Sequence, residues 1–295
     1  MEEKRQTIVH RIANDTSMGA VTLLVGDLDS MTRYYRDVVT LEVLSADGPT
    51  VTLGRAGRAI IVLQSEPALR HAAPGSAGLY HTAILFETQT ALAAALYSVA
   101  RHAPGTFTGS ADHLVSQAFY FTDPEGNGVE LYWDRDRTDW SWVHGQIEMA
   151  TLFLDPNAFL REHLTPDAAD GAAARDGASV GHVHLSVGDV NTAQKFYVDR
   201  MGFESTLRLG DQALFVSAGG YHHHMAMNVW GSRGAGRRGP ALGLGRIDLS
   251  LPDTDALGEL SERLAHYGTP MRDDGRSVSF EDPWANQLTA SAPRA

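Results

Sequence analysis

A run of seven residues, YHTAILF at positions 80–86, opens the stretch that decides the fold. Its alternation of apolar and polar side chains predicts a half-buried β-strand. Thr88 follows in a position suited to a helix N-cap, apolar residues then recur at helical spacing, and Pro104 and Gly105 end the run. The first half of this stretch therefore predicts a strand followed by a helix.

A hairpin is predicted after that helix. The runs VSQAFYF at 115–121 and VELYW at 129–133 are typical of strands, and DPEGNG at 123–128 is typical of the turn between them. Because side chains alternate along a strand, His81 and Glu130 lie on faces that can turn inward. A buried histidine and glutamate are unfavourable unless they are paired or bound to a metal. Two interpretations stay open at this point: a core histidine with a glutamate–arginine pair, or two metal ligands.

The same β-α-β-β-β order recurs along the chain. Residues 20–27, AVTLLVGD, align with residues 182–189, HVHLSVGD, and the segment DPEGNGVE at 123–130 aligns with DPWANQLT at 282–289. The repeat predicts an α+β protein of four β-α-β-β-β modules. The module boundaries fall near 17–75, 76–136, 180–232 and 242–293.

Four segments follow from this repeat. Residues 1–17 are predicted to be an N-terminal lead-in and residues 18–136 the first pair of modules. Residues 137–179 are predicted to be a helix-containing linker, rich in Ala, Gly and Asp after Thr165, and residues 180–295 the second pair.

Composition limits the function. The 295 residues include 24 Lys and Arg against 36 Asp and Glu, a formal charge of −12, which argues against nucleic acid or an anionic membrane as the main partner. The chain has no cysteine, so a metal site would use His, Asp or Glu and would favour Fe(II), Mn(II), Zn(II) or Ni(II). No run is long and apolar enough for a transmembrane helix or a signal core, which predicts a cytoplasmic protein.

Four modules with these strand ends resemble the vicinal oxygen chelate superfamily, which includes glyoxalase I, fosfomycin-resistance proteins and type I extradiol dioxygenases. The segment DHLVS at 112–116, with DPEGNGVE at 123–130, is similar to the signature around the last iron ligand of extradiol ring-cleaving enzymes. The segment GYHHH at 220–224, with Asn228 and Trp230, is similar to catechol 2,3-dioxygenases of the CatE type.

The resemblance implies that paired modules form two open cups, with metal ligands on the first and last strands of each module. The corresponding positions are Ala20 and Val62 in module one, His81 and Glu130 in module two, His182 and Ala226 in module three, and Arg246 and Thr289 in module four. Pairing one with two and three with four would separate the candidate ligands. Pairing two with three instead unites His81, Glu130 and His182 as a 2-His-1-carboxylate set for Fe(II), with Mn(II), Zn(II) and Ni(II) as alternatives. His184 remains an alternative to His182, and Arg246 counts against a second metal in the cup of modules one and four.

Further roles follow from the resemblance. His113 is the candidate acid/base residue, and Tyr120 matches a tyrosine that hydrogen-bonds a substrate oxygen. The candidate substrate-binding residues are Tyr132, His222 and His224. Alternation predicts that His223 points away from the cup. Tyr120 as a core residue and residues 222–224 as a solvated edge are the alternatives that stay open.

The leading hypothesis is an extradiol dioxygenase that uses Fe(II) and O2 to open the ring of a small catechol-like aromatic substrate. The first alternative is a glyoxalase-like isomerase or lyase that polarises vicinal oxygens with another metal, although Ala226 in the fourth ligand position favours open coordination. The second alternative is a metal-free protein that binds a small molecule or drug. The sequence leaves the oligomeric state open, a homo-oligomer included.

Overall fold

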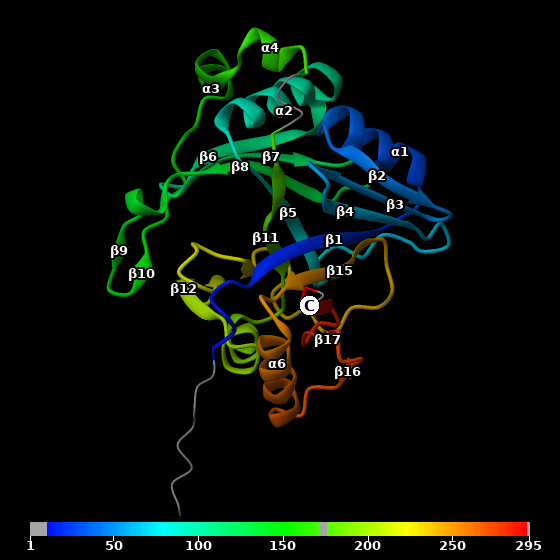
Figure 1. Ribbon diagram of the computed structural model, residues 1–295, viewed down its shortest axis with the longest axis vertical. Helices are drawn as coiled ribbons and strands as arrows, with labels where there is room; N and C mark the ends of the chain where they lie inside the picture. Colours follow the sequence, from blue (N-terminus) through cyan, green and yellow to red (C-terminus); the bar gives the residue numbers. More distant parts are fainter. Residues whose placement is uncertain (1–10, 172–175, 294–295) are drawn as a thin grey trace, which may run out of the picture.

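Two curved eight-stranded sheets make up the protein in the computed structural model, which describes residues 11–171 and 176–293 (Figure 1). Residues 1–10 of the predicted lead-in, residues 172–175 of the predicted linker and residues 294–295 lie outside the described residues. The α+β class and the two cups predicted from the sequence are confirmed.

The first sheet, called the inner sheet, is built by modules two and three. Its strands are β5 (Gly78–Phe86), β6 (Phe107–Asp112), β7 (Ser116–Thr122), β8 (Gly128–Asp134), β11 (Ala178–Ser186), β12 (Glu204–Leu209), β13 (Ala213–Ser217) and β14 (Met225–Asn228). Their order is β12-β13-β14-β11-β5-β8-β7-β6. The two modules meet where β5 and β11 run antiparallel, so the pairing that unites the candidate ligands is the one the protein adopts.

The second sheet, called the outer sheet, is built by modules one and four. Its strands are β1 (Ser17–Val25), β2 (Glu42–Asp47), β3 (Thr50–Arg55), β4 (Arg58–Ser65), β15 (Gly243–Ser250), β16 (Met271–Asp273), β17 (Ser277–Glu281) and β18 (Gln287–Ser291). Their order is β16-β17-β18-β15-β1-β4-β3-β2, with β1 antiparallel to β15. Each sheet therefore takes one module from each half of the chain.

A capped helix follows the first strand of every module. The four helices are α1 (Leu28–Arg33), α2 (Gln89–His102), α5 (Val190–Gln194) and α6 (Thr254–His266), and π-helical turns η1 (Tyr34–Val38) and η5 (Lys195–Arg200) continue α1 and α5. Asp27, Thr88, Asp189 and Asp253 accept backbone N–H bonds at the four N-termini, which confirms the cap predicted at Thr88. None of the described helices is long and apolar enough to cross a bilayer.

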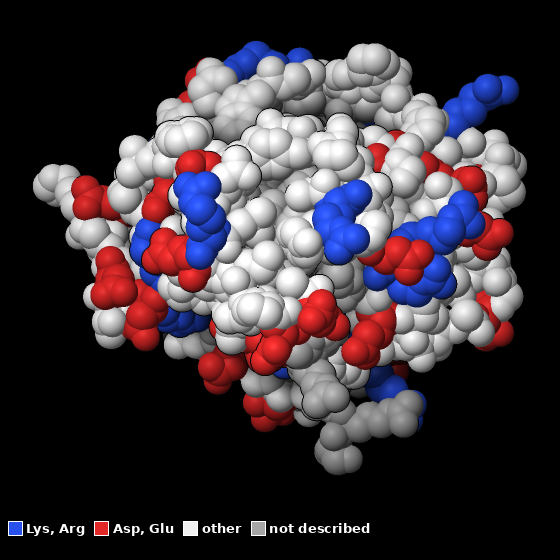
Figure 2. Space-filling model, turned by 90° about the horizontal axis from the view of Figure 1, so that it is seen from above, with Lys and Arg blue, Asp and Glu red and all other residues white. Residues whose placement is uncertain are grey.

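The linker adds short elements to one end of the inner sheet. These are η3 (Arg137–Asp139), β9 (Trp142–Val143), β10 (Gln146–Ile147), α3 (Pro156–His163) and α4 (Pro166–Ala169). A further short element, η2 (Pro104–Thr106), lies between α2 and β6. Helices α3 and α4 lie over α2 at the top of Figure 1. On the face seen from above in Figure 2, basic side chains lie beside acidic ones with uncharged surface between them. This face carries no continuous basic surface of the kind that binds a phosphate backbone.

Two buried tyrosine–aspartate hydrogen bonds join the sheets. The Tyr35 hydroxyl donates to Asp123 Oδ2 at 3.0 Å, and the Tyr197 hydroxyl donates to Asp282 Oδ2 at the same distance. Each aspartate also accepts backbone N–H bonds from its own turn. Because each bond links one module of the outer sheet with one module of the inner sheet, the pair fastens the sheets together at two equivalent points.

Removing one of these bonds should weaken the whole fold. In Tyr197→Phe, the buried Asp282 carboxylate loses a donor, and we expect the free energy of unfolding to fall by about 1–3 kcal/mol. Urea denaturation measures this change. Tyr267→Phe is the control, because that side chain is 42% exposed. Equal stability of Tyr197→Phe and the wild type would show that the bond does not hold the sheets together.

Candidate metal centre

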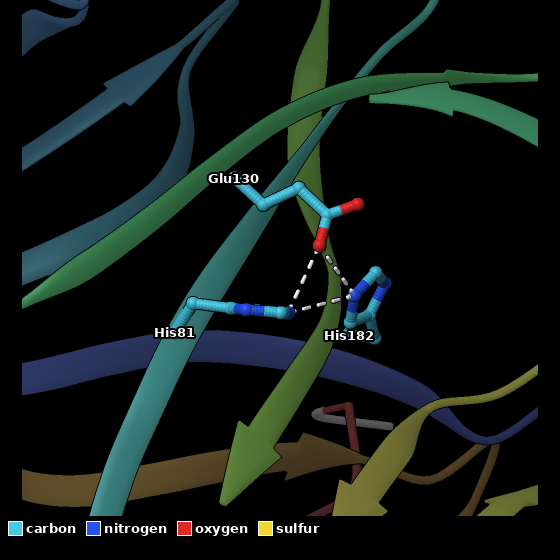
Figure 3. Close-up of side chains that lie close together, drawn as sticks. All are labelled: His81, Glu130 and His182. Atoms are coloured by element: carbon cyan, nitrogen blue, oxygen red, sulfur yellow. Dashed lines mark hydrogen bonds and ion pairs between the residues drawn. The ribbon is translucent and has the colours of Figure 1, made fainter. Parts of the chain in front are cut away.

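Three side chains from three strands of the inner sheet converge on one point (Figure 3). Glu130 Oε2 lies 2.9 Å from His81 Nε2 and 3.1 Å from His182 Nε2, and the two Nε2 atoms are 3.4 Å apart. All three residues are at most 6% exposed. Within residues 11–171 and 176–293, this is the single group of three or more His, Asp or Glu side chains whose ligating atoms all lie within 4.8 Å of one another.

Strand register produces this convergence. Glu130 of β8, Ala83 of β5 and His182 of β11 are direct partners across neighbouring strands, so they form one row. His81 lies two residues before Ala83 and therefore on the same face. Ala83, the middle residue of the row, carries only a methyl group. The space above it therefore stays free for the ends of the Glu130 and His182 side chains.

A β-bulge at Gly181 brings His182 into that row. The register of β11 against β5 shifts between Val180 and His182, so Gly181 is an extra residue on β11. A Cβ atom on Gly181 would overlap the hydroxyl of Tyr132. Glycine is therefore required at this position for the close approach of the tyrosine.

The three residues fit a metal ion. Donor atoms about 3 Å apart match an ion held at about 2.0–2.2 Å by imidazole nitrogen and carboxylate oxygen. Burial lowers the pKa of His182 to about 4, so its ring is neutral near pH 7, as ligation requires. Burial disfavours the charge on Glu130, but His182 and His81 outweigh this effect and hold its pKa well below the usual value. A carboxylate with two imidazoles on one side is the donor set of non-haem Fe(II) sites.

A cavity of about 830 Å³ opens beside these residues. Two of the predicted catalytic residues, His113 and Tyr120, line it together with the three candidate ligands. The Tyr120 hydroxyl lies 2.6 Å from His113 Nε2, and His113 Nδ1 lies 2.6 Å from the carbonyl oxygen of Ala150. Because a carbonyl only accepts, His113 Nδ1 carries the proton and the Tyr120 hydroxyl donates to Nε2. Burial and the Glu130 carboxylate hold the pKa of Tyr120 well above its usual value.

His184 lies beside the group but is not part of it. Its ring centroid is 4.9 Å from that of His81, and its Nε2 atom lies 3.0 Å from Asn228 Nδ2. An amide nitrogen only donates, so His184 Nε2 is occupied as an acceptor. Of the two alternatives that the sequence leaves open, His182 is the one whose nitrogen faces His81 and Glu130.

The direction predicted for residues 222–224 is wrong. His223 lines the cavity, whereas His222 and His224 do not. The prediction assumed strand alternation, but β14 begins only at Met225, and two glycines with positive φ, Gly219 and Gly220, precede the histidines. The solvated-edge alternative is also wrong, since all three histidines are at most 8% exposed.

The three predicted substrate-binding residues, Tyr132, His222 and His224, lie behind the cavity wall. The Tyr132 hydroxyl is 2.8 Å from that of Tyr221, and Tyr132 is fully buried. His224 Nδ1 accepts the backbone N–H of Ala218 at 3.1 Å. Tyr132, His222 and His224 are therefore supports for the wall, and direct contact with a substrate in the cavity would require them to move.

A chain of three residues that sequence reasoning missed sets the proton position on His223. Asp134 Oδ1 lies 2.9 Å from His222 Nε2, and His222 Nδ1 lies 2.8 Å from His223 Nδ1. The carboxylate accepts from His222 Nε2–H, so His222 Nδ1 accepts from His223 Nδ1–H. Burial lowers the pKa of His223 well below its usual value, so the ring is neutral and Nε2 keeps a lone pair. No sequence signal points to Asp134, because its partner lies 88 residues away.

Comparisons with known proteins show the family to which the chain belongs. The model of the glyoxalase/bleomycin resistance protein/dioxygenase superfamily matches residues 17–131 and 179–288. The chain belongs to this superfamily. It is 34% identical over 281 residues to catechol-2,3-dioxygenase of Bacillus subtilis (strain 168), covering 92% of this chain and 95% of that protein.

Solved members of the superfamily share the fold at low identity. A protein of Bacillus subtilis subsp. subtilis str. 168 superposes with a TM-score of 0.64 at 15% identity, covering 97% of this chain and 87% of that one. Glyoxalase I of Zea mays superposes with a TM-score of 0.55 at 15% identity, covering 94% and 92%. The fold is therefore shared with a glyoxalase I, and fold similarity alone does not distinguish between reactions.

Metal content tests the candidate ligands. After anaerobic incubation with Fe(II) and desalting, we expect about one iron per chain in the wild type and loss of iron in His182→Ala, since one of three donors is gone. Elemental mass spectrometry measures the ratio. Arg246→Ala and His184→Ala are the controls and should keep their iron: Arg246 is paired with Asp248 on the surface, and His184 with Asn228. Iron retained in His182→Ala would remove it from the ligand set.

The buried histidines should make stability depend on pH. Burial lowers the pKa of His224 from its usual 6.5 to about 3. Below pH 6.5 the unfolded chain therefore binds a proton that the folded chain does not, and the free energy of unfolding falls as pH drops toward 3. Between pH 7 and pH 5 this residue accounts for a loss of about 2 kcal/mol.

Urea titrations at pH 7, 6 and 5 measure this effect. In His224→Gln the amide oxygen can still accept the Ala218 N–H, but the side chain does not titrate. We expect the variant to lose about 2 kcal/mol less than the wild type across this range. Parallel pH profiles for the two proteins would contradict the assignment.

Proposed function

We propose that the protein is a non-haem Fe(II)-dependent extradiol dioxygenase that cleaves a catechol-like aromatic substrate with O2. The observation that carries this proposal is the buried set of two histidines and one glutamate on the wall of a cavity that also contains Tyr120, His113 and His223. Identity of 34% to a catechol-2,3-dioxygenase over nearly the whole chain supports it.

The ligand count favours a dioxygenase over a four-ligand isomerase site. Ala226, which occupies the fourth position of the paired modules, has no ligating atom and is fully buried between His184 and Phe215. Iron held by His81, Glu130 and His182 would supply open positions at which vicinal substrate oxygens and O2 bind together.

The residues around this set provide for proton movement. A catechol that binds through both oxygens releases protons, and His223 lines the cavity with its Nδ1 hydrogen-bonded to His222, which leaves the lone pair on Nε2 as a proton acceptor. Tyr120 carries a proton on its hydroxyl. The hydroxyl oxygen and His113 Nε2 are 2.6 Å apart, so a proton can move between the two side chains. His223 is thus the proposed proton acceptor, and Tyr120 with His113 the proposed proton donor pair.

Turnover of simple catechols tests the reaction class. With protein loaded anaerobically with Fe(II), we expect one O2 to be consumed for each ring-opened product molecule formed. The product should absorb visible light. An O2 electrode and a spectrophotometer measure both. His182→Ala should show neither. Isomerisation of the adduct of methylglyoxal and glutathione without O2 uptake would instead establish a glyoxalase-like enzyme.

His223 lines the cavity and its neighbour His224 does not, so variants of the two residues give a sharper test. We expect His223→Ala to lower kcat about 10²–10⁴-fold with iron content retained, since a proton acceptor is lost. His224→Ala, which removes a histidine from behind the wall, should change kcat far less. Steady-state kinetics with iron analysis measure both variants. The reverse order would show that His224 faces the substrate.

A further inference from the structure

The candidate cavity is much larger than a catechol ring. An apolar cavity of about 150 Å³ is enough to hold benzene. The cavity beside the candidate ligands measures about 830 Å³, which lies in the range of about 300–1,000 Å³ typical of sites for drug-sized molecules. A single ring with two hydroxyl groups would leave most of this space to water.

The lining of the cavity differs between the candidate metal position and β12. Imidazole and phenol side chains, those of His81, His113, Tyr120, His182, His184 and His223, lie near the candidate metal position, and Thr108, Ser116, Thr122 and Thr151 are further polar lining residues. A second group of lining residues is apolar and lies farther along the sheet. This apolar strip consists of Leu207 and Leu209 on β12, Phe215 on β13, and Trp230 after β14.

Strand register places the strip. Leu207, Phe215, Ala226 and His184 form one row across the sheet, beside His81. Leu209, Ala213, Asn228 and Ser186 form the next row outward. Ser186 lies four residues beyond His182 on β11, so the outer row is about 13 Å from the candidate metal position along the strand.

The outer end of the strip is the mouth of the cavity. Leu209 is 46% exposed and Trp230 is 52% exposed, whereas the candidate ligands are at most 6% exposed. Tyr80, which also lines the cavity, is 43% exposed, and its ring lies 5.5 Å from that of Trp230. The mouth therefore presents an aliphatic side chain and two aromatic rings to an entering molecule.

Charge along the wall is of one sign. Among the described residues that line the cavity there is no lysine or arginine, and Glu130 is the single carboxylate. A carboxylate on the substrate would be removed from water without a cationic partner, which is strongly unfavourable. The formal charge of −12 on the whole chain adds a repulsive field for anions.

We propose that the substrate is a catechol with an uncharged apolar substituent, and that this substituent lies along the apolar strip from Phe215 and Leu207 to Leu209 and Trp230. This inference rests on the proposed function for the ring itself. It selects alkyl- or aryl-substituted catechols over catechols that carry a carboxylate side chain.

A matched pair of substrates tests the proposal. 4-Butylcatechol and 3-(3,4-dihydroxyphenyl)propanoate have side chains of similar length and differ in charge, and unsubstituted catechol is the reference; 3-butylcatechol covers the other ring position. For Fe(II)-loaded protein, we expect kcat/KM for the better butylcatechol to exceed that for catechol at least tenfold and that for the propanoate at least a hundredfold. Equal values for catechol and both butylcatechols, or a preference for the propanoate, would overturn the proposal.

Variants at the mouth locate the substituent. Leu209→Lys puts a cation at the outer end of the strip, and we expect it to lower kcat/KM for butylcatechol about tenfold and to raise that for the propanoate at least tenfold. Leu209→Met is the control and should keep the wild-type preference. An unaltered preference in Leu209→Lys would place the substituent elsewhere.

Binding separates this proposal from the reaction itself. Anaerobic titrations of the same compounds, followed by tryptophan fluorescence, measure affinity without turnover. If butylcatechol binds more tightly than the propanoate but no catechol consumes O2, the apolar strip is supported and the dioxygenase reaction is rejected. If catechols are cleaved without preference and bind equally, the reaction is supported and the apolar strip is rejected.

Discussion

The antiparallel pairing of β5 with β11 is the contact on which the candidate site depends. It joins modules from the two halves of the chain and places His182 in one row with Ala83 and Glu130. Side chains alternate along strands, so a slip of one residue would turn His182 to the other face of the sheet. The bulge at Gly181 sets this register, and the Tyr132 hydroxyl fills the space that a side chain at Gly181 would need.

The two sheets have different roles, although both are built from the same kind of module. In the inner sheet, module two supplies His81 and Glu130, and module three supplies His182. At the corresponding positions the outer sheet has Arg246, which is paired with Asp248 near the surface, and Thr289, which is hydrogen-bonded to Ser279. The outer sheet instead fastens the inner one through the buried bonds of Tyr35 to Asp123 and of Tyr197 to Asp282. The same module pattern thus forms both the site and its support.

Local patterns in the sequence were enough to predict the modules and their helices, and the inner pairing followed from the ligand positions that the family resemblance implies. Alternation placed His81 and Glu130 on inward faces, and the requirement for a third ligand selected module three as the partner. The alternative of a glutamate paired with an arginine is wrong, because the neighbours of the Glu130 carboxylate are His81 and His182.

Properties that depend on register between distant strands could not be predicted in the same way. The direction of His223 depends on where β14 begins, and the position of its proton depends on Asp134, far away in sequence. The apolar strip likewise arises from residues on β12 and β13 together with Trp230, which follows β14. The most direct test of the central claim is an anomalous difference map at the iron absorption edge from crystals grown anaerobically with Fe(II). The account predicts one peak among His81 Nε2, Glu130 Oε2 and His182 Nε2, and a peak elsewhere, such as at residues 222–224, or none at all, would contradict it.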